Sequence, residues 1–173
     1  MDDNNSIRLS GIAYESLVNG PGIRRVLFAQ GCKHNCSNCF NKHTHSFDGG
    51  QIKKINELVE DIVSNPMLRG VTFSGGDPVE QAEKFAELAK EVKKAKLDIW
   101  CYTGYSFEYI VKHQHQNKGW QELLKQIDVL VDGKYMDELA DSHLRFRGSS
   151  NQRIIDVQES MRTGEVRVLD YDN

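Results

Sequence analysis

Apolar residues occur along the chain in two alternating patterns, short continuous runs and stretches of helical spacing. The run Ile23–Ala29, which lies between the turn residues Asn19–Gly22 and Gly31, predicts a strand. From Ile55 to Val63 the apolar residues recur three and four positions apart, which predicts an amphipathic helix that ends before Pro66. The first third of the chain therefore contains a predicted strand followed by a predicted helix.

The same alternation continues toward the C-terminus. Further strands are predicted at Val71–Phe73, Asp98–Tyr102, Val129–Val131 and Val166–Leu169, and further helices at Ala82–Val92, Phe107–Val111 and Leu123–Leu124. Strands that alternate with helices favour right-handed βαβ crossovers and a mainly parallel sheet. A complete eight-fold barrel needs about 250 residues, whereas this chain has 173. The predicted fold is therefore α/β: an incomplete, TIM-like βα barrel or an open, mainly parallel sheet.

The chain shows no internal repeat, low-complexity tract or linker. Since a domain typically has roughly 100–200 residues, we expect residues 1–173 to form a single domain. Its core should span about 18–152, and the C-terminal tail is less regular.

Charge and polarity exclude several classes of partner. The chain has 22 Lys+Arg and 25 Asp+Glu, and their even distribution leaves no basic footprint for nucleic acid or an anionic membrane. Residues 1–5 are acidic and polar, unlike a secretory leader, and no apolar stretch approaches the ~18 residues of a membrane span. We therefore expect a cytoplasmic protein with no nucleic-acid or membrane partner.

Three of the four cysteines, Cys32, Cys36 and Cys39, lie in one short segment after the first predicted strand, and Cys101 lies far away. A disulfide scaffold would spread its cysteines along the chain, so this clustering indicates a metal site. Thiolates select zinc, Cu(I) or an iron–sulfur cluster. A structural zinc site would take a fourth ligand such as a nearby histidine (His34, His43 or His45), whereas a [4Fe–4S] cluster with three protein ligands would leave one iron open. Cys101, inside an apolar strand, is expected in the core.

Polar or glycine-rich segments follow each of the next three predicted strands, at Ser74–Asp77, Thr103–Tyr105 and Asp132–Lys134. Because the carboxyl ends of parallel strands lie at one edge of a sheet, we expect these segments and the cysteine segment to converge on one face. Asp77 has two compatible interpretations. Asp77, Pro78 and Glu80 form a capping box for the next helix, while Gly75 and Gly76 allow the backbone to approach a ligand closely.

The spacing Cys32-x3-Cys36-x2-Cys39 resembles that of radical S-adenosylmethionine (SAM) enzymes, and the surrounding motifs resemble the activating proteins of anaerobic ribonucleoside-triphosphate reductase. The ordered set that carries this resemblance is Val18–Gly22, Leu27–Phe28, Gly31–Lys42, Ser74–Pro78, Trp100–Tyr105, Val129–Lys134 and Arg147–Gln152. One departure concerns the residue before the third cysteine, which is usually aromatic in the superfamily. Here that residue is Asn38, and Phe40 follows the cysteine.

The resemblance implies a glycyl radical enzyme activase, an oxidoreductase. In such an enzyme a reduced [4Fe–4S] cluster gives one electron to SAM, and the resulting 5′-deoxyadenosyl radical takes a hydrogen atom from a glycine of the partner reductase. An electron donor such as flavodoxin or ferredoxin would reduce the cluster.

The resemblance also implies roles for individual residues. Cys32, Cys36 and Cys39 would be the catalytic cluster ligands. The residues that would bind the SAM cofactor are Asn38, Cys39, Phe40, Gly75, Gly76, Asp77 and Lys134. From the residues alone, Lys134 is either a partner of the SAM carboxylate or a solvated surface lysine.

Three other functions stay open from the sequence. The chain could activate another glycyl radical enzyme such as pyruvate formate-lyase, it could be a small radical SAM enzyme of modified-base synthesis, or it could be a non-catalytic zinc-binding module.

Overall fold

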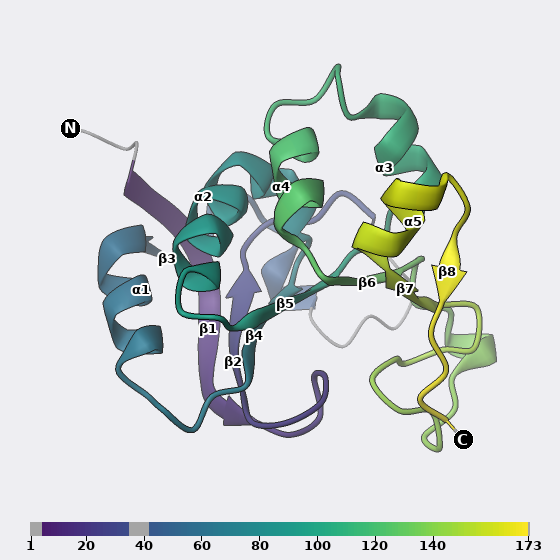
Figure 1. Ribbon diagram of the computed structural model, residues 1–173, viewed down its shortest axis with the longest axis horizontal. Coiled ribbons are helices and arrows are strands. Elements are labelled where there is room, and N and C mark those ends of the chain that lie inside the picture. Colours follow the sequence, from purple (N-terminus) through teal and green to yellow (C-terminus); the bar gives the residue numbers. More distant parts are fainter. Residues whose placement is uncertain (1–4, 35–41, 173) are drawn as a thin grey trace.

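The structure is a computed structural model that describes residues 5–34 and 42–172. Its centre is one twisted sheet of eight strands, ordered β3-β1-β2-β4-β5-β6-β7-β8 (Figure 1). The strands are β1 (Ser6–Ser16), β2 (Arg24–Ala29), β3 (Gln51–Lys54), β4 (Gly70–Gly75), β5 (Asp98–Tyr102), β6 (Val129–Asp132), β7 (Arg153–Asp156) and β8 (Arg167–Val168).

The fold is mixed α/β, and the prediction of a mainly parallel sheet is correct only for its centre. The strands β2, β4, β5 and β6 pair in parallel. The flanks are antiparallel: β1 pairs with β2 and β3 on one side, and β7 pairs with β6 and β8 on the other. The physical reason lies in the connections. A short turn joins β1 to β2, and such a turn can join only antiparallel strands, because a parallel pair needs a crossover of a dozen or more residues.

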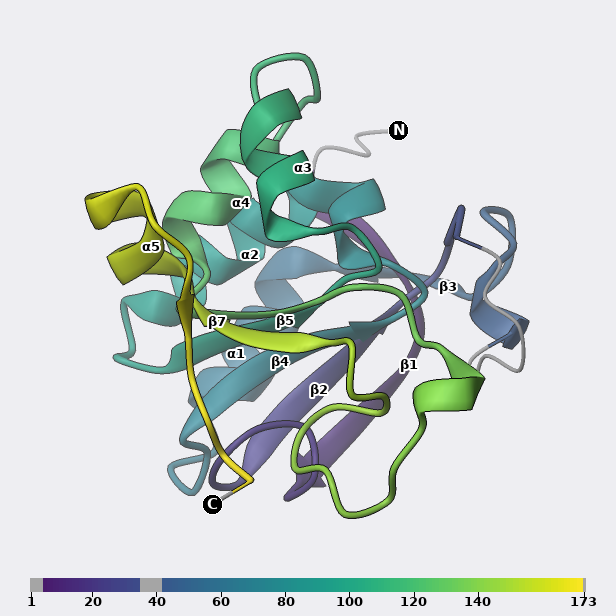
Figure 2. The same ribbon diagram turned by 90° about the vertical axis from the view of Figure 1, so that its right-hand side faces the viewer.

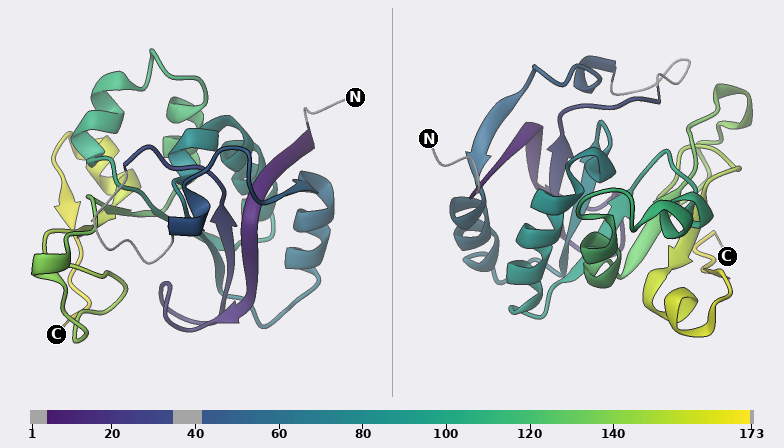
Figure 3. Two further views of the ribbon diagram at one scale, coloured as in Figure 1. Left: turned by 180° about the vertical axis from the view of Figure 1, so that it is seen from behind. Right: turned by 90° about the horizontal axis from the view of Figure 1, so that it is seen from above.

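Five α-helices are present among the described residues: α1 (Ile55–Val63), α2 (Ala82–Lys93), α3 (Phe107–His113), α4 (Trp120–Gln126) and α5 (Val157–Thr163). Short 3-10 helices are η2 (Lys42–Thr44), η3 (Pro78–Gln81) and η4 (Asp137–Leu139). The view from above shows α1, α2 and α4 side by side along one face of the sheet (Figure 3), and α2 contacts both of the others. None of the helices in the described part of the chain is long and apolar enough to cross a membrane.

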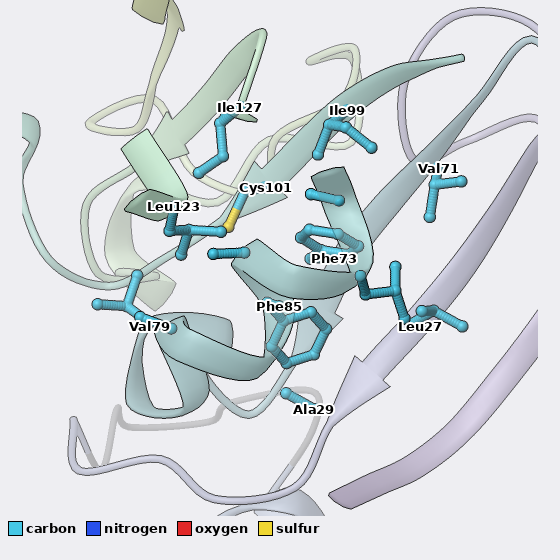
Figure 4. Close-up of a cluster of buried hydrophobic side chains, with 14 of the residues drawn as sticks. Leu27, Ala29, Val71, Phe73, Val79, Phe85, Ile99, Cys101, Leu123 and Ile127 are labelled. Atoms are coloured by element: carbon cyan, nitrogen blue, oxygen red, sulfur yellow. The ribbon is translucent and has the colours of Figure 1, made fainter. Parts of the chain in front are cut away.

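The main core lies between this helical layer and the sheet (Figure 4). Phe73 of β4 packs against Phe85 of α2 with ring centroids 4.6 Å apart. Cys101 of β5 is fully buried in the same layer, and Figure 4 shows its sulfur beside Leu123 of α4. Burial, and then the negative charge of Asp77, raise the pKa of the Cys101 thiol well above its usual value. Because a metal ligand must be a thiolate, these surroundings confirm the prediction that Cys101 is a core residue.

The opposite face of the sheet carries a smaller cluster around Trp100, Val131 and Ile154. The C-terminal segment and the loop between β6 and β7 lie over this face (Figure 2), where Tyr171 and Phe146 pack edge-on against Trp100. This face has no helical layer among the described residues, so it is the open side of the sheet.

Most predicted elements are confirmed within one or two residues, and the missed ones have weak patterns. The strand β1 was not predicted because its alternation of Ile7 and Leu9 breaks at a register shift before Gly11. The edge strand β3 is largely exposed and has no apolar pattern. The helix α5 buries Val157 and Ser160, and a serine in the core position gives no hydrophobic signal.

Replacing Cys101 with alanine tests whether its thiol belongs to the core. We expect Cys101→Ala to lower the free energy of unfolding by about 1 kcal/mol, because one buried sulfur atom is lost and a small cavity remains. Metal content should not change in protein prepared without oxygen. Urea denaturation and a metal assay of the same preparation measure the two quantities, and a variant that loses metal would make Cys101 a ligand instead.

Candidate functional site

A cavity of about 220 Å³ opens at the carboxyl ends of the central parallel strands. Its walls come from the loops after β2, β4, β5 and β6, together with the end of the β6–β7 loop. The residues that line it include Cys32, His34, His45, Ser74, Gly75, Gly76, Tyr102, Thr103, Gly104, Gly133, Lys134, Tyr135, Gly148 and Gln152. The prediction that four polar loops converge on one face is therefore confirmed.

The cysteine-bearing loop leaves the sheet through a neck closed by backbone hydrogen bonds. Gly31 donates its N–H to the carbonyl of Thr44 at 2.5 Å, and Cys32 donates to the carbonyl of His45 at 3.2 Å. Cys32 and His45 both line the cavity. The neck therefore holds the first cysteine of the motif at the wall of the cavity.

The other predicted residues of this loop, Cys36, Asn38, Cys39 and Phe40, lie outside the described residues. Among residues 5–34 and 42–172, no three His, Cys, Asp or Glu side chains form a group that could hold a metal ion. The assignment of Cys36 and Cys39 as metal ligands therefore stays a prediction.

Gly75 and Gly76 lie directly against the backbone that leads into the cysteine loop. Gly75 has a φ of +94°, and a Cβ at this position would lie 2.5 Å from the backbone nitrogen of Ala29. A Cβ on Gly76 would collide with the carbonyl oxygen of Gly31. The two glycines are thus required by close backbone packing, and they also leave the cavity wall without side chains at these positions.

Asp77 caps the helix that follows, as its sequence predicts. Its Oδ1 accepts a hydrogen bond from the N–H of Val79 at 3.0 Å. The reciprocal half of the expected capping box is not formed, because the Asp77 N–H donates to the carbonyl of Gly31 at 2.8 Å. The Glu80 carboxylate, which would complete the box, instead accepts a hydrogen bond from the Tyr105 hydroxyl.

The second carboxylate oxygen of Asp77 joins two other loops to this cap. Oδ2 accepts hydrogen bonds from the Thr103 hydroxyl at 2.9 Å and the Gly104 N–H at 3.0 Å, and it lies 2.6 Å from Nε2 of His34. Asp77 is completely buried. The residue that sequence reasoning missed here is His34, which the sequence offered only as a possible fourth ligand of a zinc site. Its partner lies 43 positions away, and no periodic signal connects them.

Lys134 follows β6 and lines the cavity with an exposed side chain. The loop behind it is held internally. Asn151 donates from its side-chain amide to the Lys134 carbonyl at 2.8 Å, and Gln152 donates to the Gly133 carbonyl at 3.1 Å. The Gln152 side-chain oxygen in turn accepts the N–H of Gly148 at 2.8 Å. The polar residues of the Arg147–Gln152 motif therefore build the loop that forms one side of the cavity.

Two tyrosines near the site stay protonated at neutral pH. Burial raises the pKa of Tyr102, whose hydroxyl donates to the Phe146 carbonyl at 2.5 Å. Burial, and then the hydrogen bond to Glu80, raise the pKa of Tyr105. Tyr102, which lines the cavity, therefore supplies no base at neutral pH.

The chemistry of the cavity wall fits a metal group held by thiolates, because the soft thiol of Cys32 lies beside glycine backbone that carries no side chains.

Comparison with known proteins shows the family to which the chain belongs. The family model for 4Fe-4S single cluster domains matches residues 18–155. The chain is 40% identical over 143 residues to the anaerobic ribonucleoside-triphosphate reductase-activating protein of Enterobacteria phage T4, covering 79% of this chain and 86% of that one. The proteins of the same name from Vibrio cholerae and Escherichia coli K12 are 40% and 35% identical over 147 residues, covering 90% of each relative.

Among solved structures, the crystal structure of QueE from Escherichia coli aligns with a TM-score of 0.45 and 16% identity, covering 57% of this chain and 53% of QueE.

The match over residues 18–155 places the protein in the class of 4Fe-4S single cluster domains. Within that class, the chain belongs to the family of anaerobic ribonucleoside-triphosphate reductase-activating proteins. The resemblance seen in the sequence motifs is therefore confirmed.

Replacing Asp77 with alanine tests its place at the junction of the loops. We expect Asp77→Ala to lower the free energy of unfolding by about 2–4 kcal/mol, because the helix cap is lost and buried donors on Thr103 and Gly104 lose their acceptor. Glu87→Ala, which removes an exposed carboxylate on α2, is the control and should change stability by less than about 0.5 kcal/mol. Equal urea midpoints for the two variants would contradict this account.

Proposed function

We propose that this protein activates anaerobic ribonucleoside-triphosphate reductase by forming a glycyl radical on it. The observation that carries the proposal is that Cys32, the first thiol of the three-cysteine motif, and Gly75–Gly76 of the glycine motif line one cavity. A group held by that thiol and a ligand held by the glycine backbone would therefore be neighbours. The names of the curated relatives support the choice of reductase.

In this proposal Cys32, Cys36 and Cys39 hold one [4Fe–4S] cluster with an open iron. The residues proposed to contact SAM are Asn38, Cys39, Phe40, Gly75, Gly76 and Lys134. Asp77 was also expected to bind SAM, but it is completely buried, with both carboxylate oxygens hydrogen-bonded, so it supports this wall of the cavity instead. Gly75 and Gly76 present backbone groups to the cavity without side chains in the way. Lys134 is exposed at the cavity wall, where its ammonium group can pair with a carboxylate.

A reduced cluster held by Cys32, Cys36 and Cys39 would supply the single electron for reductive cleavage of SAM, and the chemistry at the target glycine would be removal of one hydrogen atom. The chain itself supplies ligation, orientation and exclusion of water. Its described residues bring the cysteine loop against the glycine motif through the Gly76–Ala29 and Asp77–Gly31 hydrogen bonds. We further propose that the protein is a cytoplasmic oxidoreductase that receives its electron from a donor such as flavodoxin or ferredoxin.

The open side of the sheet supports a protein substrate. We propose that residues 1–173 form a single domain and that the sheet is an incomplete TIM-like barrel. The four parallel strands and their helices form one wall, and the face opposite the helices has no matching layer among the described residues. A docked reductase would then cover the radical site and exclude solvent from it.

The decisive test is radical formation on the partner. Protein reconstituted with iron and sulfide without oxygen, then reduced, should release 5′-deoxyadenosine from SAM and produce a glycyl radical signal in electron paramagnetic resonance (EPR) spectra of the reductase. Cys32→Ala should abolish both products, and Cys101→Ala should retain them.

Two results would overturn the proposal. A colourless preparation that binds zinc but no iron or sulfide would favour a zinc-binding module. A radical that forms on pyruvate formate-lyase but not on the reductase would assign the chain to a different partner.

A further inference from the structure

His34 stands two positions after Cys32 and two before Cys36, yet it points into the protein. Its side chain is only 7% exposed, and Nε2 lies 2.6 Å from Oδ2 of the buried Asp77. Because an ionised carboxylate only accepts hydrogen bonds, Nε2 is the donor in this pair. The cysteine loop is therefore tied to the loop that follows β4.

The acceptor of this hydrogen bond is fixed from several directions. Asp77 also accepts from the N–H of Val79, the hydroxyl of Thr103 and the N–H of Gly104. These donors come from the start of η3 and from the loop after β5. Asp77 therefore cannot follow a displacement of the histidine without breaking bonds in two other segments.

The ring itself fits a space shaped by its neighbours. It packs edge-on against Tyr105 with ring centroids 4.4 Å apart and planes at 73°. Gly104 lies directly beneath it, and a Cβ on Gly104 would come within 2.5 Å of the His34 ring, so alanine does not fit there unless the ring moves. Tyr105 is held in turn by Trp120, with ring centroids 5.2 Å apart.

We propose that His34 is a positioning residue that sets the direction in which the cysteine loop leaves its neck, and so the relation between the cluster ligands and the SAM-contacting backbone of Gly75 and Gly76. This inference rests on the proposed function. The hydrogen bonds between Gly31 and Thr44 and between Cys32 and His45 already close the neck. The hydrogen bond from His34 to Asp77 adds a further constraint beyond the neck, because His34 lies between Cys32 and Cys36 in the sequence.

Three variants separate the hydrogen bond from the ring. His34→Phe keeps an aromatic ring against Tyr105 and removes the donor. His34→Gln removes the ring and keeps an N–H donor at the same number of bonds from Cα. His43→Gln is the matched control, because His43 lies on the same loop with an exposed side chain.

The readouts are the dissociation constant for SAM of the reduced, reconstituted protein and the EPR spectrum of its cluster with SAM. We expect His34→Phe to raise the dissociation constant by about tenfold, the factor expected for loss of a hydrogen bond to a charged group. Its cluster spectrum with SAM should be broadened by a spread of loop positions. His34→Gln should stay within about threefold of the wild type, and the control should match it. If His34 were merely structural, its substitutions would shift the urea midpoint, and His34→Gln would not restore the affinity for SAM.

Gly104→Ala provides an independent probe, since it displaces the ring and leaves His34 in the sequence. Alone, it should weaken SAM binding about as much as His34→Phe. In the background of His34→Ala, Gly104→Ala should raise the dissociation constant for SAM little further, because the ring that blocks the new methyl group is gone. Additive effects of the two substitutions would contradict the proposed contact.

The outcomes distinguish this inference from the proposed function. A wild type that binds and cleaves SAM, with His34→Phe equal to His43→Gln in affinity and spectrum, overturns the positioning role and leaves the activase intact. A wild type that carries the cluster and does not bind SAM overturns both. A His34→Gln variant as impaired as His34→Phe would also contradict the role given to the hydrogen bond.

Discussion

The buried carboxylate of Asp77 is the constraint on which the site depends. A fully buried carboxylate is costly unless each oxygen is well hydrogen-bonded, and here both oxygens are. One caps η3, and the other receives His34, Thr103 and Gly104. These donors belong to different loops, so the need to satisfy one charge brings together segments that are far apart in the sequence. A helix cap thereby becomes the junction of the site.

The parallel centre of the sheet makes that junction possible. The strands β2 and β4 pair in register up to Ala29 and Gly75, so the cysteine loop and the glycine motif begin side by side. The glycines then let the two backbones touch, with Gly76 donating its N–H to the Ala29 carbonyl at 2.8 Å. The antiparallel flanks extend the sheet, and the C-terminal segment covers part of its open face. The cavity therefore lies where the parallel strands end.

The sequence predicts local elements well and long-range contacts poorly. The helix at Ile55–Val63 can be predicted from apolar spacing because it buries one face. The strand at Asp98–Tyr102 can be predicted because its central residues form a buried apolar run. The cap at Asp77 was also predicted, since a cap depends on residues two or three positions away. The pairing of Asp77 with His34 was not, because it arises from the meeting of two loops 43 residues apart. The motif of three cysteines indicated the 4Fe-4S family because ligand spacing is local. The ligand roles of Cys36 and Cys39 stay predictions, since both residues lie outside the described residues.

The central claim is that a cluster held by three cysteines has an open iron beside the glycine motif, where SAM binds. The most direct measurement is electron–nuclear double resonance of the reduced protein with SAM labelled with ¹⁵N at its amino group. The account predicts a nitrogen coupling to the cluster in the wild type, because SAM bound at the open iron would lie next to the cluster. An iron–sulfur cluster whose spectrum shows no coupling and does not change when SAM is added would contradict it.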